Sequence, residues 1–390
     1  MRKLTADVLF HNGCFRRNLG LVIDRESKIL EVNEVNDANR WEYEFFPGIL
    51  SPGFVNCHCH LELSHLRSKF DTGTGLIHFL HSVVSQREIE QEVIDAAILE
   101  ADRQMWSSGI QAVGDICNKL DTLSVKLKSK ISYYSFIESF DFLQDQLCDQ
   151  MTQSYADVFH QWTDQLKSFV PHAPYSVSKT LFEKINLLNS KDAVLSIHNQ
   201  ELDAEDALFE FGDRRFLQFF EQFGFGFEHF KPSGKKSIYT VLESLSADFQ
   251  LLFVHNTMTE LAELKFVKQN RDKAFFITCP QANLFIENRL PNYRAWIEAG
   301  VSVGIGTDSL SSNWSLDILE EIKTISKFHS WIPLEQLFQW ATINGAKALK
   351  MENTMGNFES GKAPGIVWIK NIDSLSEIRL TKNSVAQRIS

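Results

Sequence analysis

From residue 54 onward, short apolar runs alternate with longer segments in which apolar residues recur at helical spacing. The runs are rich in Val, Ile, Leu and Phe, which is typical of strands buried on both faces of a parallel sheet. They span residues 54–60, 112–115, 131–137, 169–172, 193–198, 251–255, 274–279 and 301–308. The clearest helix is predicted over 88–106, where Ile94, Ile98 and Met105 share one face. The pattern therefore predicts repeated strand–helix units.

Eight such units suit a closed (β/α)8 barrel. The alternative is a doubly wound open sheet, which also alternates strands and helices. However, no Gly-rich phosphate loop follows any of the eight apolar runs, although nucleotide-binding open sheets typically have one. We therefore predict an α/β fold built on a (β/α)8 barrel.

The two ends of the chain show a different pattern. Residues 7–10, 19–24 and 28–32 form short apolar runs separated by polar turns, and no helical period precedes residue 50. The tail at 361–369 again resembles β structure, and we expect it to pair with the N-terminal strands. We predict a small β-sandwich from both ends of the chain. The predicted boundaries are 1–52 and 351–390 for the sandwich and 53–350 for the barrel.

One segment, residues 203–240, interrupts the strand–helix repeat after the fifth strand and is rich in Phe and acidic residues. Irregular loops of this length are uncommon in compact domains unless they are functional. We predict that part of the segment forms short amphipathic helices, covers the barrel mouth and supplies apolar walls there. The alternative is that it packs on the outside of the barrel.

Composition narrows the classes of partner. A formal net charge of -11 argues against nucleic acid or an acidic membrane as the main partner. Six cysteines lack paired or Cys-x-x-Cys spacing, which favours a reduced, cytoplasmic protein. We find no apolar segment of signal-peptide length, and no uncharged run approaches the ~20 residues of a membrane helix. The expected partner is a small molecule, and whether the protein also forms a homodimer stays open.

Polar residues recur where the predicted strands end. They are His58 and His60 on the first strand, His172 on the fourth, His198 on the fifth, His255 on the sixth and Asp308 on the eighth. The carboxyl ends of barrel strands converge on one face, where active sites lie. A single His of this kind is usually a hydrogen-bonded core residue, but five with an aspartate indicate a metal site. His58 and His60 alternate with cysteines and therefore point to the same side of their strand.

The motifs around these residues resemble those of the amidohydrolase superfamily. They are Pro-Gly-Phe-Val-Asn-Cys-His58-Cys-His60, His198-Asn-Gln-Glu201, Phe-Val-His255-Asn, Thr-Cys-Pro280-Gln-Ala-Asn283 and Gly-Thr-Asp308-Ser. Within the superfamily the chain is most similar to the mononuclear aminohydrolases, and among these to the aminofutalosine deaminases of menaquinone biosynthesis. That similarity is carried by the segments His172-Ala-Pro-Tyr-Ser-Val177 and Asp308 through Asn313.

The resemblance implies one divalent metal. Relatives with two metals usually place a modified lysine at the end of the fourth strand, where this chain has His172. His58, His60, His198 and Asp308 are the expected ligands, which leave a position open for water, as catalytic metal sites require. Zinc is the expected metal, and iron(II) is the alternative because it accepts the same nitrogen and oxygen donors.

Each remaining residue has an expected role. Asp308 takes a proton from the attacking water, and Glu201 acts as the general acid that protonates the ring and the leaving amine. His255 polarises the water or the adduct, although it could instead be a ligand. His172, Asn283 and Ser309 are expected substrate contacts.

The predicted function is hydrolytic deamination of an aminopurine-type compound, with release of ammonia. The favoured substrate is 6-aminodeoxyfutalosine. The alternatives are an adenosine-like nucleoside such as S-adenosylhomocysteine or methylthioadenosine, or another C–N or C–Cl bond. A non-catalytic assembly protein on the same fold is disfavoured, because every expected ligand is present.

Overall fold

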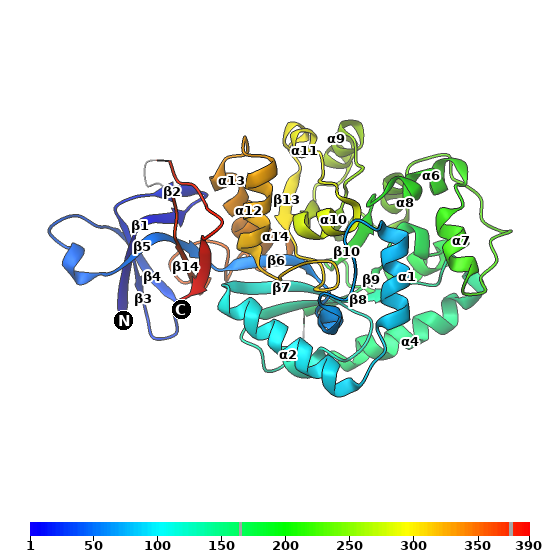
Figure 1. Cartoon of the computed structure of the whole chain (residues 1–390), viewed down its shortest axis with the longest axis horizontal. Helices are drawn as coiled ribbons and strands as arrows, with labels where there is room; N and C mark the ends of the chain where they lie inside the picture. The colour runs from blue at the N-terminus through cyan, green and yellow to red at the C-terminus, as the bar shows by residue number, and fades with distance from the viewer. Residues whose placement is uncertain (164–165, 374–376) are drawn as a thin grey trace.

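Eight parallel strands form the centre of the protein, arranged as two four-stranded sheets with the orders β6-β7-β8-β9 and β10-β11-β12-β13. The computed structural model describes residues 1–163, 166–373 and 377–390 (Figure 1). The strands are β6 (Phe54–Cys59), β7 (Ile110–Cys117), β8 (Ser132–Ser139), β9 (Leu166–Pro171), β10 (Val194–Asn199), β11 (Gln250–His255), β12 (Ala274–Thr278) and β13 (Ser302–Ile305). All six residues of β6, β10 and β11 are buried, as expected for strands covered on both faces.

The two sheets join at both seams through hydrogen bonds at the carboxyl ends of their strands. At one seam, the backbone N–H of His198 donates to the carbonyl oxygen of His172 at 3.0 Å. At the other, the N–H groups of Thr307 and Asp308 donate to the carbonyl oxygen of His58, each at 3.0 Å. The predicted (β/α)8 barrel is confirmed, and the ends of all eight strands meet on one face.

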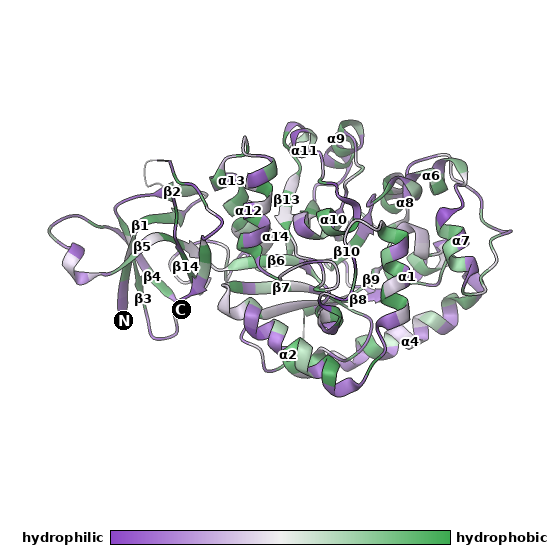
Figure 2. Ribbon diagram, viewed as in Figure 1, coloured by the Kyte–Doolittle hydropathy of each residue, from purple (hydrophilic) through white to green (hydrophobic). Residues whose placement is uncertain are grey.

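Helices surround the barrel and expose their polar sides. Along α2 (Gln91–Ser107), Ile94, Ile98, Ala101 and Met105 are buried, and Figure 2 shows hydrophilic and hydrophobic residues alternating along this helix and α4. The predicted helix 88–106 is this helix, which begins three residues later than expected.

The other α-helices are α1 (Leu76–Gln86), α3 (Leu123–Lys126), α4 (Cys148–Gln161), α5 (Lys179–Leu188), α6 (Asp203–Phe211), α7 (Arg215–Glu221), α8 (Ser237–Ser244), α9 (Leu261–Asn270), α10 (Pro280–Glu287), α11 (Tyr293–Ala299), α12 (Ile318–Phe328), α13 (Leu334–Gln339) and α14 (Gly345–Ala348).

The N- and C-terminal segments form a separate seven-stranded sheet beside the barrel (Figure 1). Its strands are β1 (Arg2–His11), β2 (Cys14–Arg16), β3 (Leu19–Ile23), β4 (Ile29–Glu34), β5 (Glu44–Pro52), β14 (Ile366–Lys370) and β15 (Val385–Arg388). As predicted, the C-terminal tail returns to pair with the N-terminal strands, because β14 lies antiparallel to β5. The boundaries predicted at 52/53 and 350/351 stay a prediction.

The Phe-rich segment 203–240 forms α6, α7 and the start of α8. Its apolar side chains join a separate core cluster together with residues of α1 and α10. Within that cluster the ring of Phe216 stacks on Tyr175, with centroids 3.9 Å apart. The segment therefore packs against the helices at the carboxyl end of the barrel.

No helix within the described ranges has both the length and the apolar character needed to cross a membrane.

Candidate active site

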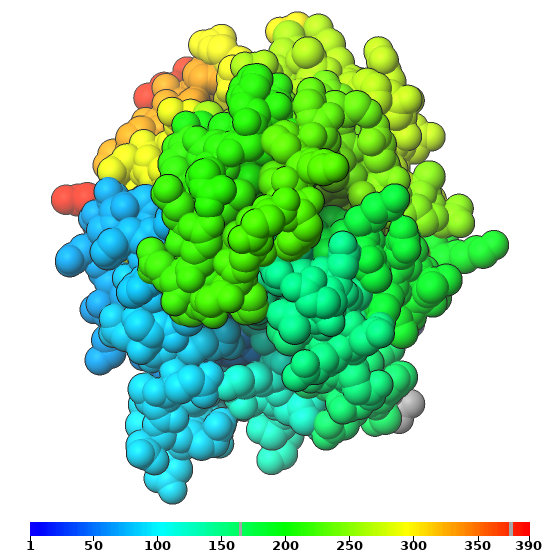
Figure 3. All heavy atoms as spheres, turned by 90° about the vertical axis from the view of Figure 1, so that its right-hand side faces the viewer, coloured from blue at the N-terminus to red at the C-terminus, as the bar shows by residue number. Residues whose placement is uncertain are grey.

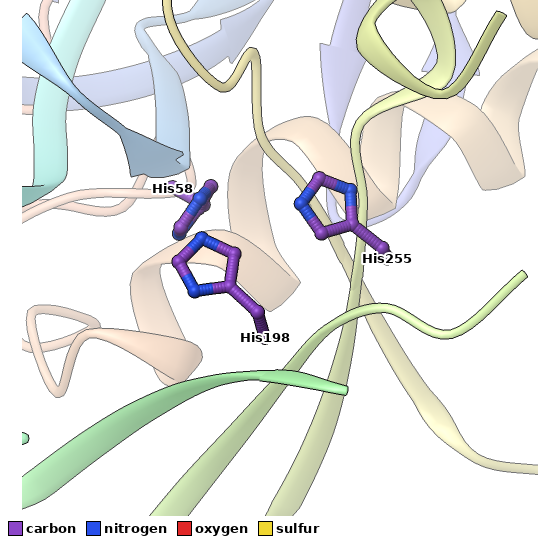
Figure 4. Close-up of side chains that lie close together, drawn as sticks. All are labelled: His58, His198 and His255. Atoms are coloured by element: carbon purple, nitrogen blue, oxygen red, sulfur yellow. The ribbon is translucent and has the colours of Figure 1, made fainter. Parts of the chain in front are cut away.

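Three imidazole rings and one carboxylate converge at the carboxyl ends of the barrel strands. Nε2 of His60 lies 3.2 Å from Nε2 of His58 and 3.2 Å from Nε2 of His198. Oδ1 of Asp308 lies 3.7 Å from Nε2 of His58 and 3.5 Å from Nε2 of His60. His58 and His198 face each other in Figure 4, and His255 approaches the same space from the next strand.

The protonation of these rings fits a cation between them. Nδ1 of His198 lies 2.8 Å from the carbonyl oxygen of His172. Since a carbonyl oxygen can only accept, Nδ1 carries the proton and Nε2 presents a lone pair. Burial lowers the pKa of His60 to about 3, so this ring is neutral as well. Facing lone pairs repel unless a cation separates them, and nitrogens at the usual zinc distance in a tetrahedral site lie about 3.3 Å apart.

Asp308 is held rigidly beside this set. It follows β13 by three residues, so the predicted strand 301–308 ends earlier, at Ile305. Its Oδ2 accepts a hydrogen bond from Ser312 at 2.5 Å. Burial raises the pKa of Asp308, but the neighbouring histidines outweigh burial, and the net pKa lies below its usual range. Gly306 permits the close approach, because a Cβ there would lie 2.8 Å from Cβ of His58.

Four residues at the strand ends around this centre have left-handed backbone conformations. Positive φ angles occur at Gln200 (47°), His255 (71°), Asn256 (47°) and Asp308 (58°). Left-handed conformations are uncommon for residues other than glycine and cluster at functional sites. Of these four residues, His255 and Asp308 line the cavity, whereas the side chain of Gln200 bonds to Asp206.

Glu201 and His255 lie next to each other beside the cluster of His58, His198 and Asp308. Nε2 of His255 is 3.8 Å from Oε1 of Glu201. Nδ1 of His255 is 2.7 Å from Oδ1 of Asn283, so Nδ1 donates and Nε2 faces Glu201 as an acceptor. Burial raises the pKa of Glu201 well above its usual range. The backbone carbonyl of Glu201 accepts from Thr257 at 2.7 Å, which fixes the loop.

The loop after His60 rests on a buried ion pair. The N–H of Leu61 donates to Oδ1 of Asp115 at 2.8 Å. The other oxygen of Asp115 lies 2.5 Å from Nζ of Lys126, and both side chains are buried. Lys126 also lies over the ring of Trp162, 4.6 Å from its centroid. The hydrogen bond from Leu61 therefore ties the segment after the first barrel strand to the second strand, and Lys126 neutralises the carboxylate that accepts it.

A cavity of about 420 Å³ opens onto this centre. It is lined by His60, His172, His198, Glu201, His255, Asp308 and Ser309, and otherwise mainly by apolar residues of α1 and the Phe-rich segment. From that segment come Phe219, Phe220, Phe223 and Phe225. In Figure 3, residues of this part of the chain lie over the middle of the face. The segment thus supplies apolar wall to the cavity, and its covering of the barrel mouth stays a prediction.

Of the three predicted substrate contacts, two line the cavity and one does not. His172 and Ser309 line the cavity, and Nδ1 of His172 is 2.7 Å from Oγ of Ser176. Asn283 lies on α10, outside the described cavity lining, and bonds to His255.

Sequence reasoning missed the cavity residues Arg87, Asn118 and Glu138. Glu138 carried a signal, because it directly follows the predicted strand 131–137.

Comparisons with known proteins find relatives of similar sequence and structure. A relative from Helicobacter pylori named adenosine deaminase is 31% identical over 361 residues, covering 88% of this chain and 85% of the relative. The aminodeoxyfutalosine deaminase of Nitratiruptor sp. is 28% identical over 289 residues, covering 72% and 68%. A crystal structure of Helicobacter pylori aminofutalosine deaminase with methylthio-coformycin aligns with a TM-score of 0.78 and 25% identity, covering 98% of this chain and 94% of that chain.

The barrel and its polar strand ends define a hydrolase of carbon–nitrogen bonds other than peptide bonds. The chain belongs to the amidohydrolase family, whose model matches residues 49–387.

Proposed function

We propose that this enzyme removes the amino group of an aminopurine nucleoside by hydrolysis and releases ammonia. The observation that supports this most directly is the position of Glu201, a buried carboxyl 3.8 Å from His255 that lines the same cavity as the ligand set. Release of an amine requires a proton, and a positioned carboxylic acid can supply one. The relatives named as deaminases of adenosine and aminodeoxyfutalosine favour the same reaction.

We propose His58, His60, His198 and Asp308 as the ligands of one zinc ion. Their three neutral nitrogens and one carboxylate oxygen form a donor set that suits zinc, and iron(II) accepts the same donors. When bound, the metal lowers the pKa of a water molecule to about 7. A second metal is disfavoured, because the fourth strand is followed by His172 rather than by a lysine.

The side chains around the ligand set carry the proton transfers. Asp308 accepts a proton from the attacking water as that water adds to the carbon that bears the amine. Glu201 donates its proton to the adjacent ring nitrogen, then takes the proton of the hydroxyl added to the carbon and passes it to the amine, which leaves as ammonia. The proton held by Asp308 restores the carboxylic acid of Glu201 for the next turnover. His255 stabilises the polar groups that form at the attacked carbon. Asn283 acts as a positioning residue, because it fixes the tautomer of His255.

The favoured substrate is 6-aminodeoxyfutalosine, an adenine nucleoside with a carboxylated phenyl group. The apolar cavity walls from α1 and the Phe-rich segment suit the phenyl group. The second candidate is adenosine, because a relative of that name is 31% identical. We expect no role for nucleic acid.

Steady-state kinetics distinguish these candidates. The purified enzyme would be assayed for ammonia release from 6-aminodeoxyfutalosine, adenosine, S-adenosylhomocysteine and methylthioadenosine. We expect the highest kcat/KM for 6-aminodeoxyfutalosine. A higher kcat/KM for any of the other three would contradict the favoured substrate and leave deamination intact, whereas no ammonia from all four would contradict the proposed reaction.

A further inference from the structure

Gln200, which directly precedes Glu201, is turned away from the cavity. Glu201 belongs to the described cavity lining, whereas Gln200 does not. Gln200 is fully buried, and its φ of 47° is left-handed. For a residue other than glycine such a conformation costs free energy and persists where the surroundings fix it. The turn that carries Glu201 therefore depends on contacts that Gln200 makes outside the cavity.

The carboxyl of Glu201 is not held by hydrogen bonds of its own. Within the described ranges no donor forms a hydrogen bond with it, and Nε2 of His255 lies 3.8 Å away. The backbone carbonyl of Glu201, by contrast, accepts from Oγ1 of Thr257 at 2.7 Å. The place of the carboxyl is therefore set by the backbone of its turn.

The side chain of Gln200 uses both its donor and its acceptor groups. Nε2 donates to Oδ2 of Asp206 at 2.9 Å and to Oε1 of Glu263 at 2.7 Å. Oε1 accepts from Oγ1 of Thr259 at 2.6 Å. A primary amide suits this place, because it offers two N–H donors to the two carboxyls and a carbonyl to the hydroxyl. We call Gln200 with these three partners the Gln200 clamp.

The backbone of Gln200 is fixed as well. Its N–H donates to Oε1 of Glu205 at 2.8 Å, and its carbonyl oxygen accepts from the N–H of Met258 at 3.1 Å. Glu205 is fully buried and also accepts from Nδ2 of Asn199 at 2.8 Å. Because its side chain and its backbone are both engaged, Gln200 is restrained to its left-handed conformation.

The Gln200 clamp joins two strand-end turns. Gln200 itself follows β10. Asp206 lies in the first turn of α6, where the Phe-rich segment begins. Thr259 lies in the turn after β11, the strand that ends at His255. The clamp therefore ties the turn that carries Glu201 to the turn that follows His255, and it does so from outside the cavity.

We propose that Gln200 is a positioning residue, which holds Glu201 beside His255 so that the carboxyl of Glu201 reaches the ring nitrogen and the leaving amine. Gln200 acts through Glu201 and does not itself contact the substrate. The inference rests on the proposed function, because it concerns the residue that carries the protons there. A misplacement of a reacting group by about 1 Å can lower a rate by ~10²-fold.

A double-mutant cycle tests this coupling. Gln200→Ala removes the side-chain bonds of the clamp, Glu201→Gln removes the proton transfer, and a third variant carries both changes. Gln200→Asn is a milder change in case Gln200→Ala fails to fold, because asparagine tolerates a left-handed φ but is one methylene shorter. Gln222→Ala is the control, since Gln222 is an exposed glutamine of the Phe-rich segment outside the described cavity lining. For each variant, kcat and KM for adenosine and the metal content are measured.

We expect Gln200→Ala to lower kcat by about tenfold to a hundredfold, with unchanged metal content and little change in KM. Gln200→Asn should lose less, and Gln222→Ala should match the wild-type enzyme. In the Glu201→Gln background, Gln200→Ala should change kcat by less than about twofold, because a residue that acts through Glu201 then has no proton donor left to position.

Three results of the cycle would overturn the inference. The first is a wild-type kcat in both Gln200 variants. The second is the same loss from Gln200→Ala in the Glu201→Gln background as in the wild-type enzyme, since independent sites give additive effects. The third is a loss of metal together with kcat, which would show that Gln200 supports the metal ligands instead.

Crystal structures separate this inference from the proposed function. The distance between Nε2 of His255 and Oε1 of Glu201, 3.8 Å in the wild-type structure, would be measured in Gln200→Ala without substrate. If no aminopurine is deaminated, the proposed function fails, yet a displaced Glu201 carboxyl with His58 and His198 in place would still support the positioning role. An unchanged carboxyl in Gln200→Ala would overturn that role even if deamination occurs.

Discussion

The cavity has two ends that are built from different parts of the fold. At the inner end, His58, His198 and Asp308 project from the ends of barrel strands and are almost completely buried. At the outer end, the wall comes from α1 and the Phe-rich segment, where Val84 is 48% exposed and Phe223 is 43% exposed. The inner end is restrained by backbone hydrogen bonds across the barrel seams, whereas the outer wall is held by side-chain packing.

This difference separates the chemistry from the choice of substrate. Residues at strand ends keep their geometry because neighbouring strands fix the backbone on both sides. Helices and loops at the barrel mouth can change their side chains without altering that geometry. We therefore expect substitutions at the inner end to abolish turnover on every substrate and substitutions at the outer end to alter the ranking of substrates.

The largest effect is expected from removing a ligand at the inner end. His198→Ala deletes a nitrogen that faces His60 at 3.2 Å, so the variant should lose bound metal and measurable turnover with all nucleosides. His81→Ala, on an exposed residue of α1, is the matched control. Metal content by mass spectrometry and ammonia release are the measurements, and full metal content with normal turnover in His198→Ala would exclude it as a ligand.

The next largest effect is expected for Glu201→Gln. Glutamine preserves size and hydrogen bonding but cannot donate a proton to the ring, so kcat should fall by about 10²- to 10⁴-fold. Metal content should stay at the wild-type level, because Glu201 is outside the ligand set. Turnover close to that of the wild-type enzyme would remove Glu201 from the mechanism.

A third effect concerns the support beneath the inner end. Lys126→Met leaves Asp115 buried without its cation, and breaking a buried ion pair usually lowers the free energy of unfolding by about 3–5 kcal/mol. The exposed Lys128→Met provides the control, and denaturant unfolding gives the free energies. The double variant Lys126→Met with Asp115→Asn should recover part of the loss; a double variant no more stable than Lys126→Met would argue against the ion pair as the cause.

The smallest effect is expected at the outer end. Phe223→Ala removes one ring from the cavity wall, which should lower kcat/KM for 6-aminodeoxyfutalosine by about two- to tenfold, the usual range for one aromatic contact. Adenosine, which lacks the phenyl group, should be unaffected. Phe211→Ala is the control, because Phe211 lies on α6 and is 80% exposed. An equal loss on both substrates would mean that Phe223 does not read the phenyl group.

The sequence was more informative about the inner end than about the outer end. Apolar runs end at His60, His198, His255 and Asp308, and His58 lies two residues before His60, so the strand pattern alone was enough to bring these residues to one face. The packing of α7 against α1 could not be predicted, because it depends on side chains distant in sequence.

The same limit explains the residues that sequence reasoning missed or placed differently. Arg87 and Asn118 reach the cavity from the end of a helix and from a loop, which have no sequence period that marks them. Asn283 was predicted to touch the substrate, but the turn into α10 directs it to His255. Glu138 was within reach of the rule that found the histidines, since β8 continues two residues beyond the predicted end.

The most direct test of the central claim, that a single metal at the inner end supports deamination, is a metal titration. Metal-free enzyme would be titrated with zinc while ammonia release from 6-aminodeoxyfutalosine and adenosine is followed. We predict that deamination begins with the first zinc added and reaches its maximum at about one equivalent per chain. Saturation only at two equivalents, or no ammonia release at any zinc concentration, would contradict the claim.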